Sequence, residues 1–98
     1  MDRKDLEKSW RKTKRLLEAA REQLPKDVAA SEEGWSIQQY EEWVAHNELE
    51  LAFDELEGLG NENNCGRGFW LQLHAAAENM GLLDKATRCQ EREEKASA

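Results

Sequence analysis

Two histidines and two cysteines, His46, Cys65, His74 and Cys89, are the side chains of this sequence best suited to binding a transition metal. Structural zinc sites usually take such ligands in close pairs of the CxxC or HxxxH kind, which hold two donors within one turn or on one helix face. The four residues are separated by 19, 9 and 15 positions, so no such pair occurs. The spacing predicts no metal and no cofactor. The alternative, four distant ligands that meet in the fold, is open to zinc titration.

The nearest approach to a catalytic pair is His46 with Glu48. A general base also needs a pocket and an orienting partner. The sequence contains no serine nucleophile elbow, no glycine-rich phosphate loop and no HExxH motif. His46 is explained more simply as a residue at a helix end, where its hydrogen bonds suit the last carbonyls. We therefore predict no catalytic residues and a protein that is not an enzyme.

Two further features bear on location. Two cysteines make a poor disulfide framework and indicate reduced thiols, which are typical of the cytosol. The charged N-terminal segment is followed by no apolar core of a secretory signal, and no apolar run reaches the length of a membrane span. We expect a cytoplasmic protein that does not interact with membranes.

Charge is distributed very unevenly along the chain. Residues 1–26 carry nine Lys and Arg against five acids, residues 27–66 carry eleven acids and no Lys or Arg, and residues 67–98 carry five of each. Such asymmetry bears on partners rather than on fold. Glu7, Glu18 and Glu22 interrupt the basic N-terminal segment, so we read it as a solvated helix surface and expect no nucleic-acid partner. The acidic middle predicts a protein partner with a basic surface.

The elements that must position these residues are helices. Glu, Lys, Ala, Leu and Arg dominate and only one proline occurs, which predicts an all-α fold, a small bundle of four to five helices with short loops in a single domain, residues 1–98. A long basic helix is expected over about 3–24, ended by Pro25. Its apolar stripe alternates spacings of four and three. The stripe residues are Leu6, Trp10, Thr13, Leu17, Ala20 and Leu24.

A core helical unit is expected over about 36–82. Ser36 with Gln39 forms a capping box at its start, after a connector in which Trp35 is expected to be exposed. We predict that this helix ends near His46 and that Asn47 is the N-cap of the next.

The next helix is expected to run to about Leu59, ended by Gly58 and Gly60. After a turn-rich loop, a fourth helix closes with Gly81 and Leu82 in a Schellman-type stop. A C-terminal helix over about 83–94, with a frayed tail, completes the prediction.

The helix after Asn47 carries the most distinctive surface. Its core face leaves Leu51 on the polar side, with acids on both flanks. An apolar group ringed by charge is typical of an interaction hot spot. The predicted partner-binding residues are Glu48, Glu50, Leu51, Asp54, Glu55 and Glu57. The alternatives are that the acids form only a solvated face and that Leu51 packs under the first or last helix.

The segment over about residues 37–82 also resembles a known family. The shared pattern is a helix ending in His-Asn-Glu or His-Gly-Glu, a helix with Leu-Ala, an aromatic or aliphatic residue and Asp or Glu, and a helix closing with Met-Gly-Leu. Its residues here are His46, Asn47, Glu48, Leu51, Ala52, Phe53, Asp54, Leu56, Met80, Gly81 and Leu82. In this the chain resembles the MafI-type immunity proteins, small helical proteins of polymorphic and contact-dependent toxin systems. The resemblance implies a protein that binds and blocks a cognate toxin, often a nuclease, without catalysis or cofactor.

Charge and resemblance predict the same kind of partner, because a nuclease carries a cationic cleft for phosphate. The leading hypothesis is an immunity protein that occludes a basic toxin domain with the acidic helix over 47–57. The alternative is a self-associating structural or adaptor domain, with Leu16, Leu51 and Leu71 in a dimer interface. The chain is accordingly expected to be a monomer or a homodimer.

Overall fold

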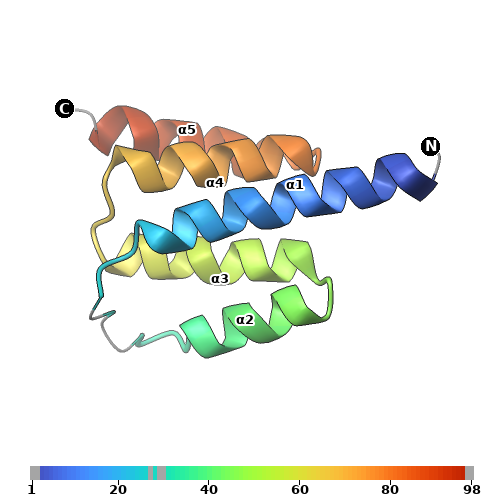
Figure 1. Cartoon of the computed structure of the whole chain (residues 1–98). Coiled ribbons are helices and arrows are strands. Elements are labelled where there is room, and N and C mark those ends of the chain that lie inside the picture. Colours follow the sequence, from blue (N-terminus) through green and yellow to red (C-terminus); the bar gives the residue numbers. More distant parts are fainter. Residues whose placement is uncertain (1–2, 27, 29–30, 97–98) are drawn as a thin grey trace.

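The computed structural model describes the chain except for residues 1–2, 27, 29–30 and 97–98, and it is an all-α bundle, as predicted. Within the described residues there are five helices and no strand. The helices are α1 (Arg3–Glu22), α2 (Ile37–Ala45), α3 (Leu49–Glu62), α4 (Arg67–Asn79) and α5 (Leu83–Ala96). Figure 1 shows their axes lying roughly side by side, with α2 and α5 at opposite edges.

The core lies between α1, α3 and α4, because each of these helices packs against the other two. The outer helices have fewer neighbours: α2 packs mainly on α3, and α5 packs mainly on α4. The largest fully buried side chains come from all five helices. They are Tyr40, Phe53, Phe69, Leu17, Leu56, Leu59, Leu73, Thr13 and Cys89.

Helix α1 buries the predicted stripe only over its second half. Leu17 and Ala20 are fully buried, and buried Thr13 accepts a hydrogen bond of 2.7 Å from Asn79 Nδ2. Trp10 is 42% exposed, because the N-terminal turns of α1 extend beyond the ends of the neighbouring helices (Figure 1). The side chain of Leu6 lies outside the described residues.

The two ends of α2 confirm one predicted cap and correct another. Ser36 Oγ accepts a hydrogen bond of 3.0 Å from the Gln39 N–H, so the predicted start of α2 is right. Asn47 is not the N-cap of α3. It has a φ of 58° and follows the C-cap His46, and the Glu48 N–H donates to the Trp43 carbonyl over 2.8 Å. This is a Schellman stop, in which asparagine tolerates the left-handed conformation, so Asn47 ends α2 instead of starting α3.

Two glycines predicted to end α3 lie inside it instead, and the helix continues to Glu62. A Cβ atom added to Gly58 would lie 2.4 Å from the Trp35 ring, and one added to Gly60 would lie 2.3 Å from the Phe69 ring. Both glycines therefore serve close packing of aromatic rings against the helix rather than chain reversal.

The end of the bundle follows the prediction closely. Gly81 has a φ of 75°, and the Leu82 N–H donates to the Ala77 carbonyl over 2.9 Å, which completes the expected Schellman stop. Helix α5 extends to Ala96, two residues past the expected end. Among the described residues, no helix is long and apolar enough to cross a membrane.

Candidate functional site

The candidate site is the side of α3 that faces away from the core. Leu51, Asp54 and Gly58 occupy positions i, i+3 and i+7, so they share one side of the helix. Leu51 is 40% exposed, so it does not pack under α1 or α5. We call this surface the outer α3 face. It consists of Leu51, Asp54, Glu57, Gly58, Asn61 and Glu62 of α3, with Glu33 and Trp35 of the connector.

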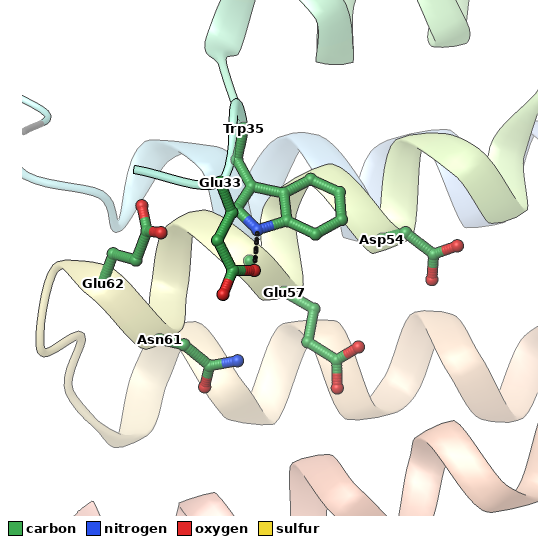
Figure 2. A pocket seen from close by; sticks show the side chains of 7 residues that line it. Glu33, Trp35, Asp54, Glu57, Asn61 and Glu62 are labelled. Carbon is green, nitrogen blue, oxygen red and sulfur yellow. Dashed lines mark hydrogen bonds between the residues drawn. The ribbon is translucent and has the colours of Figure 1, made fainter. Parts of the chain in front are cut away.

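Residues 31–35 of the connector lie against α3 and form an acidic pocket with it. The half-buried indole of Trp35 lies on Gly58, and its Nε1 donates to Glu33 Oε2 over 3.4 Å (Figure 2). At the start of this segment, Ser31 Oγ donates a hydrogen bond of 3.0 Å to Glu62 Oε1, at the end of α3. The pocket has a volume of about 270 Å³, and its lining contains four carboxylates and no Lys or Arg. Such a hollow suits a cationic side chain of a partner protein.

Helix α5 supplies the cations that the acidic segment itself lacks. Lys85 Nζ lies 2.6 Å from Asp54 Oδ1 and 3.0 Å from Glu50 Oε2. Arg88 donates from Nε and Nη2 to the two oxygens of Glu57, both over 3.0 Å. Burial opposes the charge of Lys85, but its bonds to the two carboxylates outweigh burial and raise its pKa. Three of the six predicted contact residues, Glu50, Asp54 and Glu57, are thus already paired with cations of α5.

Glu55 requires a correction, because it points into the bundle and not toward a partner. It is 7% exposed. Its Oε2 accepts a hydrogen bond of 3.0 Å from the Ser36 N–H, and its Oε1 accepts one of 3.3 Å from Trp43 Nε1. Glu55 therefore takes the role in the capping box of α2 that the prediction assigned to Gln39, whose side chain bonds Glu42 instead.

The other predicted contact residues remain at or near the surface. Glu48 is exposed at the corner between α2 and α3, and Glu50 is exposed on the α5 side of α3. Trp35 and Glu62 belong to the site but were not predicted as contacts. Their signal in the sequence was Gly58, since a glycine inside an amphipathic helix often marks the close approach of a bulky group.

The pairing with α5 also left a signal in the sequence. Asp54 and Glu57 are three residues apart, and so are Lys85 and Arg88. Equal spacing on two neighbouring helices allows two successive ion pairs in register.

The histidines and cysteines do not come together as a metal site. No group of three or more His, Cys, Asp or Glu residues in the described part of the chain could hold a metal ion. His46 is the exposed C-cap of α2, and His74 lies between Glu93 and Glu78, at 2.6 and 3.2 Å. Both cysteines are free. Burial raises the pKa of the Cys89 thiol to about 12 and also raises that of Cys65, so both thiols are protonated at neutral pH.

The cation from α5 predicts a salt-dependent stability. Lys85→Met keeps an aliphatic stem beside the Phe53 ring but leaves Glu50 and Asp54 facing each other without a cation. We expect a loss of about 1 kcal/mol in the free energy of unfolding at low salt, shrinking as salt screens the repulsion. Urea denaturation at several salt concentrations measures it. Arg11→Met, which removes an exposed pair of 3.9 Å, is the control and should change little. A salt-independent loss would contradict the electrostatic explanation.

Compared with known protein families, with curated proteins and with solved structures, the chain shows no match. The resemblance to MafI-type immunity proteins therefore stays a prediction. The case for a function rests on the chemistry of the outer α3 face and its surroundings.

Proposed function

We propose that this protein is a non-enzymatic binding protein that occludes a basic domain of another protein, and that its role is that of a toxin immunity protein. The observation that carries the proposal is the outer α3 face, where an exposed leucine and a half-buried tryptophan lie among carboxylates. An apolar anchor within a charged rim is the usual anatomy of a small protein interface.

The charge of this region survives its internal ion pairs. Residues 31–66 contain ten acids and no Lys or Arg. Lys85, Arg88 and Arg21 form ion pairs with four of the ten, Lys85 being shared by two of them, and Glu55 is buried. In the described part of the chain, the other five carboxylates have no Lys or Arg partner, and all are exposed. They are Glu32, Glu33, Glu42, Glu48 and Glu62.

This distribution moves the expected contact surface. The α3 acids beside α5 are already paired, so a cationic partner gains most from the carboxylates of the connector, of α2 and of the α2–α3 corner. Two of the exposed carboxylates, Glu33 and Glu62, line the acidic pocket beside Trp35, and Glu48 precedes Leu51 by three residues. A basic nuclease cleft would be attracted to them at long range and held by the apolar anchors.

Two surface leucines allow a matched test of the proposal. Leu51 is 40% exposed on the outer α3 face, and Leu71 is 44% exposed on α4. The probe is the purified product of a toxin-like reading frame next to this chain's gene, with calorimetric affinity and the survival of cells that express both proteins as readouts. We expect Leu51→Lys to weaken binding about 30-fold or more, because it replaces a central anchor. Leu71→Lys should bind and protect like wild type.

The salt dependence of the same complex is the second readout. Steering by carboxylates should make the affinity fall as salt rises, mainly through slower association. Equal effects of Leu51→Lys and Leu71→Lys, or an affinity independent of salt, would contradict a contact through this face. A genome in which no toxin-like gene lies beside this one would contradict the immunity role.

The alternative of a self-associating domain receives less support from the structure. Leu16, one of its three proposed interface residues, is partly buried and packs against the core. The other two, Leu51 and Leu71, are exposed, but they lie on different helices. Sedimentation at several concentrations separates the two hypotheses, since a stable dimer of the isolated chain would favour this one.

A further inference from the structure

A second pocket, at the end of the bundle where α5 finishes, has the opposite electrostatic character. Its volume is about 220 Å³. The lining is made of two cations, two amides, a thiol, an indole and small residues, and it contains no carboxylate. In a chain with 21 acids and 14 Lys and Arg, such a lining is unusual. The residues are Gly60, Asn61, Asn64, Cys65, Trp70, Arg92, Lys95 and Ala96.

Arg92 is one of the two cations of this pocket. Among the described residues, its Nε lacks the hydrogen-bond acceptor that Arg88 Nε, on the same helix, finds in Glu57. Its Cζ lies 5.2 Å from the centroid of the Trp70 ring. Stacking uses the flat face of a guanidinium and leaves its N–H edges for hydrogen bonds in the plane. Arg88 fills those edges with Glu57, whereas the Arg92 Nε is buried with no hydrogen-bond partner in the described part of the chain. A buried donor without an acceptor is costly, so a turn of the side chain that brings this edge to a ligand oxygen gains free energy.

The rest of the lining is suited to the same ligand. Lys95 is exposed and follows Arg92 by three residues, so both lie on one side of α5. Asn61 and Asn64 offer amide donors. The protonated Cys65 thiol brings no negative charge.

We infer that this pocket binds a small oxyanion, a phosphate group or a carboxylate, between Arg92 and Lys95. The guanidinium edge donates hydrogen bonds to two oxygens of such a group side by side, and the ammonium balances the remaining charge. The pocket adjoins the outer α3 face, with which it shares Asn61, but an anion bound to its cations does not require the proposed basic partner.

The test uses inorganic phosphate and acetate as probes, with chloride at equal ionic strength as the reference. One readout is the change in 1H–15N shifts of the Trp70 indole and of the amides of residues 64–66. The other is the rate at which neutral iodoacetamide alkylates Cys65, since Cys89 is 0% exposed and shielded from the reagent. We expect at least one oxyanion to shift these signals at millimolar concentration and to slow alkylation threefold or more. The tighter of the two identifies the ligand group as phosphate or carboxylate.

Variants of the two cations decide whether the effect belongs to this pocket. Arg92→Met keeps a flexible apolar side chain against Trp70 and should abolish the oxyanion effect. Lys95→Met, at an exposed position that the fold tolerates, should weaken it threefold or more. Arg15→Met, an exposed arginine on α1, is the matched control and should bind like wild type. An equal response to chloride, or an undiminished response in Lys95→Met together with Arg92→Met, would overturn the inference.

Discussion

Gly60→Ala is expected to destabilise the protein by about 2 kcal/mol, although the same change inside an ordinary helix stabilises by roughly 1 kcal/mol. The added Cβ would lie 2.3 Å from Phe69 Cε1, 2.7 Å from Phe69 Cζ and 3.0 Å from Trp70 Cη2. Both rings are buried and packed edge to face, with centroids 4.8 Å apart. The Phe69 ring lies nearest the added Cβ and is fully buried, so the overpacking penalty of up to about 3 kcal/mol exceeds the gain in helix propensity.

Gly68→Ala is the matched control for this prediction. Gly68 lies in the first turn of α4, and the nearest atom to an added Cβ is Gln23 Oε1 at 3.2 Å, the end of a flexible exposed side chain. The neighbour can move, so this variant should be as stable as wild type or slightly more stable. Urea denaturation followed by far-ultraviolet circular dichroism gives both free energies. If the Gly60→Ala protein were as stable as the Gly68→Ala protein, the Phe69 and Trp70 rings would not pack directly on the backbone of residue 60.

Glu55→Ala is the second change with a large expected effect, a loss of about 2–4 kcal/mol. It leaves two donors without an acceptor, the backbone N–H of Ser36 and the indole N–H of Trp43. An unsatisfied buried donor costs about 1–3 kcal/mol, and the removed side chain also leaves space between α2 and α3. Glu55→Gln, which retains one acceptor oxygen, should lose roughly half as much.

Glu42→Ala, on the exposed side of α2, is the control for Glu55 and should change stability by less than about 0.5 kcal/mol. The indole proton of Trp43 gives a local readout, because loss of its acceptor shifts its NMR signal upfield. If Glu55→Ala and Glu42→Ala were equally stable, Glu55 would not be the tertiary cap of α2. These outcomes also separate stability from binding. The sequence predicts Glu55 as a contact residue, whereas its hydrogen bonds in the structure predict an effect on the stability of the fold alone.

The two changes share a consequence for the outer α3 face. Glu55 fixes the start of α2, and residue 36 directly follows Trp35, the aromatic wall of the acidic pocket. The glycines of α3 seat Trp35 on one side of the helix and Phe69 on another. The side chains that shape this surface are therefore held by packing and hydrogen bonds that the surface itself does not show.

Much of the fold was readable from the sequence, because its signals are local. The Ser36 cap, the Pro25 boundary and the Gly81 stop each depend on contacts within about one helical turn, and all three are observed. The angle between successive residues places Leu51 on the polar side of α3, and its 40% exposure excludes the alternative that it packs under the first or last helix. The error at Asn47 is also local: asparagine suits an N-cap and a left-handed C′ position alike, and the corner took the second.

Only the tertiary structure decided which of the acids are free. Residues 27–66 contain no Lys or Arg, yet Lys85 and Arg88, about thirty residues further along the chain, form ion pairs with three of their carboxylates. Helical periodicity places Glu55 on a flank of α3, but whether that flank meets water or α2 depends on where α2 packs. Gly58 and Gly60 likewise look like stops until rings from other segments lie on them. A helix is specified by neighbours three and four residues apart, whereas charge compensation and close packing are specified by the segments that the fold brings alongside.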